Sequence, residues 1–256
     1  EFFDTPTPDN AFLRVDKPRL TILYEDEHLL LLDKRPGMVV HPDDKEQVNT
    51  LITHVQAYLY QKKEWSPRWE NAFAPALCNR IDRNTGGIVI AAKTAEALRV
   101  MNQKIRDREL QKLYLCVVHG AMEPRDGQLK GYLLKDGDRA QVKVYDKPVP
   151  GARTAVTLYR TLEVRNGLSL MECDLITGRT HQIRAQFAAA GHPLLGDGKY
   201  GRERDRRKFQ ALYSYKLRFA FTTGAGCLEP LNGREWTVKN VDFVEEYFPG
   251  GNHHEL

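Results

Sequence analysis

The nine residues from Asn79 to Gly87 place one carboxylate, Asp82, between two arginines, Arg80 and Arg83. Guanidinium groups on both sides favour an ionised carboxylate, which can act as a nucleophile or a general base. The Thr-Gly-Gly turn that follows allows a ligand or another backbone to approach closely. Because an Arg-Ile-Asp-Arg string is commonly a surface ion pair, the spacing alone leaves the structural interpretation open.

A second polar segment runs from Thr177 to Arg184, at the predicted start of a helix. There Arg184 is adjacent to the apolar face that contains Ile183, so its side chain can point into a cleft. Thr177 or Thr180 is the expected N-cap. An amphipathic helix with a polar start would show the same pattern.

Tyr114 and the basic string at 202–208 can each be interpreted in two ways. Tyr114 lies in a predicted strand, where a tyrosine is usually part of the core or half-buried. The string from Arg202 to Lys208 contains five basic residues, which form either a solvated face or a patch that contacts phosphates.

No metal or cofactor is expected. The histidines show no compact ligand spacing such as His-x-x-x-His. The phosphate-binding pattern Gly-x-x-x-x-Gly-Lys-[Ser/Thr] is also missing from the sequence, and the Gly-x-Gly-x-x-Gly string at 196–201 does not lie between a predicted strand and a predicted helix. Reactions that depend on ATP or a dinucleotide therefore have no support.

The composition is that of a globular protein with a mild basic bias. Of the 256 residues, 41% are hydrophobic and 28% charged, so a sizeable core is expected. The formal net charge of +4 is compatible with a polyanionic partner. No apolar run approaches the roughly 18 residues that span a membrane. The four cysteines form no Cys-x-x-Cys pair, which indicates free thiols in a reducing compartment and a cytoplasmic protein.

Hydrophobic periodicity predicts many short strands and three helices. The predicted strands cover residues 20–24, 29–33, 87–92, 112–120, 139–145, 153–164, 168–176 and 213–221. The predicted helices cover residues 49–60, 94–108 and 178–190, with Gly191 ending the last one. This order is not a regular alternation of strand and helix. It favours an α+β domain with a mixed, largely antiparallel sheet.

Four blocks of the sequence resemble the RluA-type family of pseudouridine synthases, especially its RluC/RluD-like branch. They are the hairpin and Pro-Gly loop at 22–42, Arg80-Ile81-Asp82, Lys112-Leu113-Tyr114, and the segment 177–201. The resemblance is collinear from about Leu20 to Phe248. It implies that family's fold, an α+β domain with a bent, mostly antiparallel sheet, flanking helices and an active-site cleft.

The sequence departs from the family pattern at three positions. Asn79 stands where the signature has His, Gly86 replaces a Ser, and Gln186 occupies the place of a common His. These changes leave Arg80 and Asp82 intact, so they bear on target choice more than on the reaction.

The resemblance implies a redox-neutral isomerisation of uridine that needs neither cofactor nor metal. It implies Asp82 as the nucleophile or ribose-activating base, Arg184 as its ion-pair partner, and Tyr114 as the residue that packs on the base. The target uridine must leave the RNA stack, at a cost of a few kcal/mol. The implied substrate-binding residues are Arg80, which enters the space vacated by the flipped nucleotide, Arg179, His181 and Ile183.

The expected organisation is a catalytic domain over residues 20–250, a lead-in over residues 1–19 and a tail over residues 251–256. Many members of the family carry a small RNA-binding domain upstream, and we expect one before this lead-in. The expected partner is RNA, with large-subunit ribosomal RNA as the first candidate and transfer RNA as the alternative. We expect a monomer that does not associate with membranes.

Three rival interpretations stay open on the sequence: a non-catalytic RNA-binding module of the same fold, a metal-dependent hydrolase, and a purely structural domain. A pure binder needs no carboxylate such as Asp82, and activity in excess chelator would separate the hydrolase. A structural domain leaves the four collinear blocks unexplained.

Overall fold

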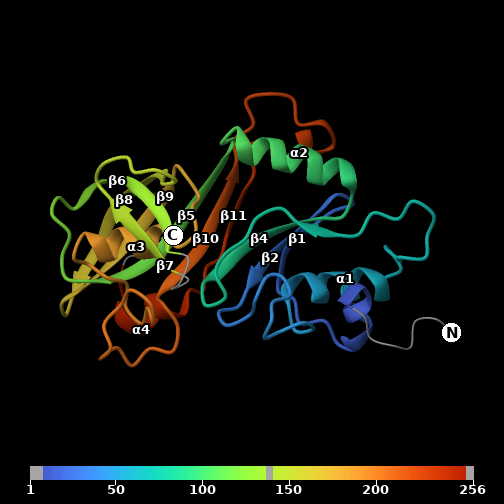
Figure 1. The fold of residues 1–256 in the computed structure, drawn as a ribbon. Helices are drawn as coiled ribbons and strands as arrows, with labels where there is room; N and C mark the ends of the chain where they lie inside the picture. Colours follow the sequence, from blue (N-terminus) through green and yellow to red (C-terminus); the bar gives the residue numbers. More distant parts are fainter. Residues whose placement is uncertain (1–7, 137–140, 252–256) are drawn as a thin grey trace. The chain divides into compact units, whose positions relative to one another are not determined.

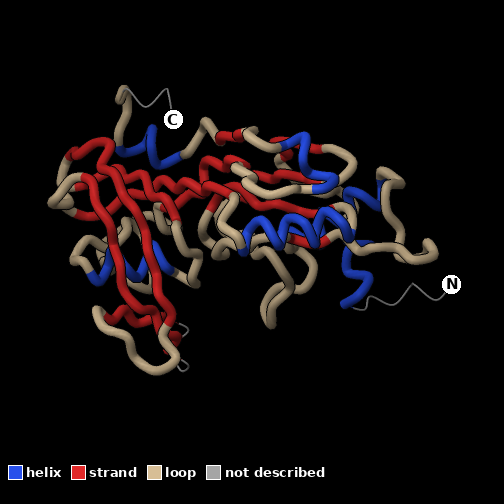
Figure 2. The backbone as a smooth tube through the Cα atoms, turned by 90° about the horizontal axis from the view of Figure 1, so that it is seen from above, coloured by secondary structure: helices blue, strands red, loops and turns tan. Residues whose placement is uncertain are grey.

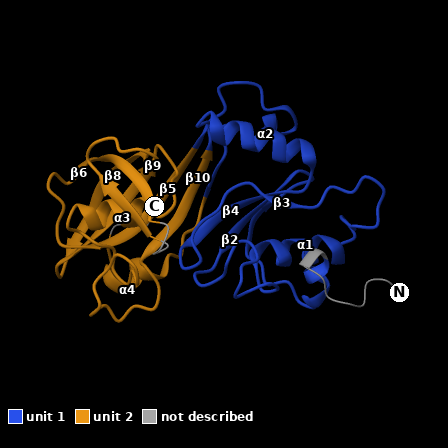
Figure 3. Cartoon of the chain, viewed as in Figure 1, with its two compact units in different colours: residues 1–110, 219–236 blue, residues 111–218, 237–256 orange. Residues whose placement is uncertain are grey.

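The computed structural model describes residues 8–136 and 141–251, which belong to two compact units (Figures 1 and 3). Residues 1–110 and 219–236 form the first unit, and residues 111–218 and 237–256 form the second. The predicted tail, apart from its first residue, lies outside the described residues, as do residues 1–7 of the lead-in. The catalytic domain predicted over residues 20–250 includes parts of both units.

The first unit is built on three antiparallel strands, β1 (Ile22–Glu25), β2 (Leu29–Lys34) and β4 (Gly86–Ala92), with β3 (Ala76–Leu77) also paired to β4. Two helices follow strands in the chain, α1 (Leu51–Gln61) and α2 (Ala95–Arg106). Each begins at a threonine, Thr50 or Thr94, whose hydroxyl accepts a hydrogen bond from the first turn. Such caps satisfy backbone donors that the helix itself leaves unpaired.

The N-terminal segment is more ordered than an extended lead-in. Residues Pro8–Arg14 form a 3-10 helix, η1. Phe12 is buried, and its ring centroid lies 5.2 Å from that of Tyr60 and 5.1 Å from that of Trp65. Burial of this aromatic ring in the core of the first unit offsets the conformational entropy lost by ordering the segment.

The second unit contains a larger antiparallel array of strands. Its strands lie in the order β10-β5-β9-β8-β6-β7, and α3 (Gln182–Ala189) contributes Ile183 and Phe187 to the core. The strands are β5 (Leu110–His119), β6 (Asp126–Asp136), β7 (Gln141–Tyr145), β8 (Arg153–Arg165), β9 (Leu168–Leu175) and β10 (Leu212–Phe219). Figure 2 shows how strongly strands predominate over helices.

These pairings confirm the predicted α+β class with a mostly antiparallel sheet. The pairs β1–β2, β2–β4, β3–β4, β5–β9, β6–β7, β6–β8 and β8–β9 are all antiparallel. Within the part of the chain that the structure describes, every helix is too short or too polar to cross a lipid bilayer.

Several element boundaries differ from the predictions. Hydrophobic periodicity did not predict β6, the short strand β11 (Glu235–Thr237), the 3-10 helix η2 (Gly226–Leu231) or the helix α4 (Asp242–Tyr247). β6 contains two glycines and charged residues, which conceal its alternation. Residues 139 and 140 of one predicted strand lie outside the described residues.

The predicted start of the third helix was wrong. That helix begins at Gln182 rather than near residue 178, and its N-cap is His181 instead of Thr177 or Thr180. His181 adopts a left-handed conformation (φ 54°) and makes no side-chain cap. Thr177 instead accepts from Val156 N and donates to Gln182, so its hydroxyl joins the turn to β8.

Candidate active site

Asp82 lies in the loop that leads into β4, and side-chain and backbone hydrogen bonds fix this loop. The side-chain amide of Asn79 binds the backbone of β4 as a neighbouring strand would. Its Nδ2 donates to the Ile88 carbonyl (3.3 Å), and its Oδ1 accepts from Ile90 N (2.8 Å). Thr85 N donates to the Asp82 carbonyl (3.1 Å), which closes a turn before the strand. Asn79 therefore has a positioning role at the place where the family pattern has His.

Lys34, at the end of β2, joins the Pro-Gly loop to the Asp82 loop. Its side chain is 1% exposed, and its Nζ donates to three carbonyl oxygens at 2.8–3.1 Å, those of Arg35, Met38 and Arg83. Burial lowers the pKa of Lys34 to about 7, and the charge of Asp82 opposes this shift. Three acceptors favour the ammonium form, because only that form has three N–H donors.

In its ammonium form, Lys34 therefore acts electrostatically on the loop that contains Asp82. Lys34 lies in the family block at 22–42, but no role was predicted for it. The sequence does contain a signal for this role, because Lys34 directly follows the apolar run Leu29–Leu32 and Asp33. A lysine at the end of such a run is buried only when its ammonium group has partners.

The two arginines beside Asp82 have different surroundings. Both side chains are exposed, and Arg83 forms an ion pair with Asp43 (2.6 Å). Burial and the nearby charge of Arg80 lower the pKa of His41, so this imidazole is neutral at neutral pH. Arg80 is thus accessible to a nucleic acid, as its predicted role requires.

In the second unit, Arg184 is a buried cation held by Asp197. Arg184 is 5% exposed, and its Nε and Nη2 donate to the two carboxylate oxygens of Asp197 at 2.6 and 2.8 Å. Burial alone would raise the pKa of Asp197, but Arg184 and two backbone N–H groups lower it below its ordinary value. This bidentate pair fixes the guanidinium plane.

Tyr200 also contacts Arg184. The guanidinium carbon lies 5.3 Å from the centre of the Tyr200 ring, and the tyrosine hydroxyl lies 2.9 Å from Nδ1 of His181. The same hydroxyl accepts from Val142 N (2.8 Å). Asp197 and Tyr200 belong to the family block at 177–201, but neither was predicted as a site residue.

The other predicted residues of this unit lie near the same helix. Tyr114 (7% exposed) and Ile183 (3% exposed) belong to one apolar cluster. Arg179 donates from Nε to the carbonyl of Thr154 (3.2 Å), the second residue of β8. Gln186 binds Thr157 and two carbonyls, so it fastens α3 to the sheet.

Comparison with known proteins decides which family this arrangement represents. The pattern of the RNA pseudouridylate synthases matches residues 28–189, which is more than half of the chain. The chain belongs to this family. This confirms the predicted RluA-type resemblance, and as a member the protein is a pseudouridine synthase, an enzyme that acts on RNA.

Bacterial relatives support this membership over nearly the whole chain. An uncharacterised RNA pseudouridine synthase of Mycoplasma genitalium is 34% identical over 82% of this chain and 67% of its own length. Ribosomal large subunit pseudouridine synthase D of Zymomonas mobilis is 33% identical over 95% of this chain and 74% of its own length. The chain thus spans about two thirds to three quarters of these relatives.

Solved structures share the pseudouridine synthase fold. Human RNA pseudouridylate synthase domain containing 4 has a TM-score of 0.68 at 21% identity, covering 92% of this chain and 94% of that chain. Human RNA pseudouridylate synthase domain containing 1 has a TM-score of 0.65 at 18% identity, covering 90% and 94%.

The predicted site residues of this synthase are divided between the two units. Arg80 and Asp82 belong to the first, and the second contains Tyr114, Arg179, His181, Ile183 and Arg184. The ion pair between Asp82 and Arg184 joins residues of different units, so it stays a prediction.

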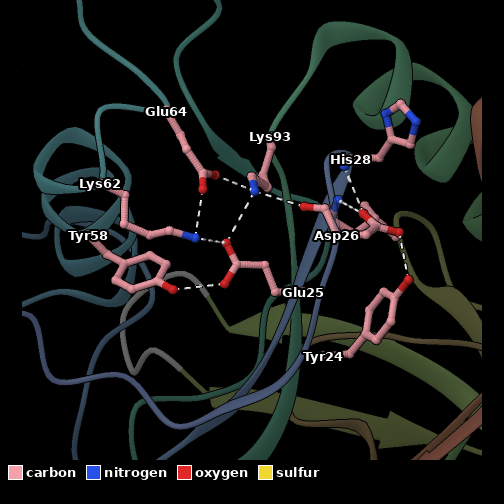
Figure 4. A network of polar contacts seen from close by, with 9 residues as sticks. Tyr24, Glu25, Asp26, His28, Tyr58, Lys62, Glu64 and Lys93 are labelled. Carbon is pink, nitrogen blue, oxygen red and sulfur yellow. Dashed lines mark hydrogen bonds and ion pairs between the residues drawn. The ribbon is translucent and has the colours of Figure 1, made fainter.

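A second polar cluster in the first unit contains Glu25, Tyr58, Lys62, Glu64 and Lys93 (Figure 4). Glu25 accepts from Tyr58 and Lys62, both at 2.8 Å, and from Lys93 at 3.2 Å. Glu64 pairs with Lys62 (2.6 Å) and Lys93 (2.5 Å). Because each carboxylate has cationic partners, this cluster stabilises the unit and offers no activated group.

Proposed function

We propose that this synthase converts uridine to pseudouridine in large-subunit ribosomal RNA, with Asp82 as the reacting carboxylate. The observation that carries the proposal is the match over 95% of the chain to a relative named for the large ribosomal subunit. The fixed loop around Asp82 supports the choice of residue, because a covalent or basic catalyst needs a defined position.

In the proposed reaction, the uridine leaves the RNA stack and Asp82 attacks ribose C1′ or removes a ribose proton. The bond between uracil N1 and C1′ breaks, and its electron pair stays with the base. After the base turns, C5 bonds to C1′ while the Asp82–C1′ bond breaks or, on the second route, while Asp82 returns the proton to the ribose. C5 then loses its proton, and N1 gains one. Tyr114 packs on the base, and its hydroxyl assists the proton removal.

Arg184 is the proposed ion-pair partner of Asp82. Its guanidinium forms a bidentate pair with Asp197, and a guanidinium carries five N–H donors in one plane. A guanidinium between two carboxylates would orient Asp82 while keeping it charged.

The test is tritium release from RNA labelled at uridine C5. Asp82→Asn should abolish release, a loss of at least about 10³-fold, because the amide can neither attack nor accept the proton. RNA binding should survive. The matched control is Asp44→Asn, which removes an exposed carboxylate nearby and should release tritium like the wild type. Release by the Asp82 variant at the wild-type rate would exclude Asp82 from the chemistry.

The target is tested separately by mapping pseudouridine in total RNA with and without the gene. A site lost from large-subunit ribosomal RNA supports the proposal. A site lost only from transfer RNA overturns the choice of substrate while leaving the reaction intact.

A further inference from the structure

The segment from Arg202 to Lys208, here called the basic segment, concentrates positive charge. Its five cationic and two carboxylate side chains give a net charge of +3 within seven residues, where the whole chain has +4. On sequence alone it fits a solvated face or a phosphate-contacting patch equally well, and the structure provides contacts that separate these two interpretations.

Two residues of the basic segment anchor it to the second unit. The Asp205 carboxylate lies 3.0 Å from Nε2 of His119, on β5, and accepts from Gly196 N at 2.9 Å. The Arg207 guanidinium donates to Asp242 and Glu246 of α4, both at 2.6 Å. These contacts fix the segment to the rest of the unit at two of its seven residues.

The other cations of the segment take no part in these anchoring contacts. Their side chains are exposed and form no ion pair within the described residues; they are Arg202, Arg204, Arg206 and Lys208. A solvated charge run needs no anchoring, whereas an anchored backbone presents its free cations with less entropy to lose on binding. The arrangement therefore favours a preformed anion-binding surface.

The basic segment is also connected to the environment of Arg184. Only four residues separate its first arginine from Asp197, which binds Arg184. The turn between them is tight: Gly201 N donates to the Asp197 carbonyl at 2.8 Å, and a Cβ on Gly201 would lie 2.3 Å from that oxygen. The backbone thus fixes the distance between the segment and the buried guanidinium.

We propose that the basic segment binds the phosphodiester backbone of the RNA substrate beside the target uridine, through Arg202, Arg204, Arg206 and Lys208. The inference rests on the proposed function, since it assigns the segment to the RNA on which the enzyme acts. Backbone contacts of this kind position an RNA without reading its sequence. They also offset part of the cost of flipping a base.

The test compares a variant in which these four residues are glutamine with a control in which four exposed cations of the first unit, Arg14, Lys17, Arg99 and Arg106, are glutamine. Binding of a short RNA hairpin is measured over a range of salt concentrations. Since each neutralised phosphate contributes about 0.7–0.9 to the slope of log K against log salt, the basic-segment variant should show a slope shallower by about 3. The control should keep the wild-type slope.

A single substitution of opposite sign provides an independent test. Glu203→Gln removes the one exposed carboxylate of the segment, so it should tighten hairpin binding. Both variants replace exposed side chains and leave the anchors intact, and their circular dichroism should match the wild type. An unchanged salt slope in the quadruple variant, or weaker binding by Glu203→Gln, would overturn the proposal.

Tritium release at saturating RNA distinguishes this proposal from the proposed function. If the basic segment only binds backbone, the quadruple variant keeps the wild-type rate at saturation and needs more RNA to reach it. A wild-type enzyme that releases no tritium, combined with the shallower slope in the variant, would refute the proposed function but support the binding surface.

Discussion

At the scale of single residues, Lys34 shows how a buried charge can organise a loop that carries chemistry. Its ammonium group joins three carbonyls from two loops, and one of them belongs to Arg83, the neighbour of Asp82. A hydrophobic side chain of similar length would leave these carbonyls without their donor, and unmade buried hydrogen bonds are costly.

We expect Lys34→Met to destabilise the protein by roughly 1–3 kcal/mol and to lower kcat more than it raises KM. Urea unfolding and tritium-release kinetics measure the two effects. Lys45→Met removes an exposed lysine close by and serves as the control. A variant with reduced stability but normal kcat would limit Lys34 to a structural role.

Asp197 acts on the predicted catalytic group through Arg184, which makes it a positioning residue. Asp197→Asn keeps one acceptor oxygen but loses the charge and the bidentate geometry. We expect kcat to fall roughly 10- to 100-fold while the Kd for RNA changes little, because displacement of a catalytic group by about 1 Å has this effect. Asp197→Glu, which restores the charge, should recover part of the rate. Equal losses in kcat and RNA binding would argue for general unfolding instead.

At the scale of elements, the charged cluster of Figure 4 connects the end of β1 to α1 and to the residue after β4. Burial alone would raise the pKa of Glu25, but hydrogen bonds from Lys62, Tyr58 and Lys93 lower it below 4.5. Hydrogen bonds from Lys62 and Lys93 likewise lower the pKa of Glu64. The folded state therefore binds fewer protons than the unfolded state in this acidic range.

It follows that the cluster stabilises the first unit above pH 4.5 and that this stabilisation is lost as the pH falls through the lowered pKa values. Thermal unfolding should show a Tm that decreases in this range. Glu25→Gln should lower the Tm at neutral pH and reduce its dependence on acid, whereas Glu70→Gln, at an exposed position, should change neither. An unaltered acid dependence in Glu25→Gln would show that other carboxylates govern it.

At the scale of the whole molecule, the two units are built from interleaved segments. The first unit needs residues 219–236 in addition to residues 1–110. Glu109 accepts from the buried Lys104 (2.6 Å) and from the hydroxyls of Thr222 and Thr223 (2.9 Å each). Hydrogen bonds from Lys104 and the threonines hold the pKa of Glu109 at about 2 despite the opposing effect of burial.

We therefore expect a fragment of residues 1–110 not to fold alone, because its buried ion pair would lack the threonine partners. Circular dichroism and limited proteolysis of the fragment test this. A fragment that also carries residues 219–236 through a flexible linker should regain protection. Cooperative unfolding of the short fragment would show that the C-terminal segment is dispensable.

An element of the fold could be predicted from the sequence when neighbouring residues determine it, and not when residues distant in the sequence do. The helices at residues 51–61 and 95–106 were predicted closely, because their threonine caps and apolar faces are local signals. The start of α3 was not predicted correctly, because Thr177 does not cap the helix. Its hydroxyl instead binds Val156 of β8, which is distant in the sequence, and Gln182. β6 was missed for a similar reason, since its pairing with β7 and β8 compensates for a weak local pattern.

The sequence by itself determined the family, the α+β class and the identity of the candidate catalytic residues, since these depend on residue types in a fixed order. Only the tertiary structure decided that Lys34 is buried against the Asp82 loop, that Asp197 holds Arg184, and that alternate residues of the basic segment are anchored. Each of these depends on contacts between segments far apart in the chain or on which side chains are buried. Local residue patterns do not encode such contacts, whereas packing of the folded chain fixes them.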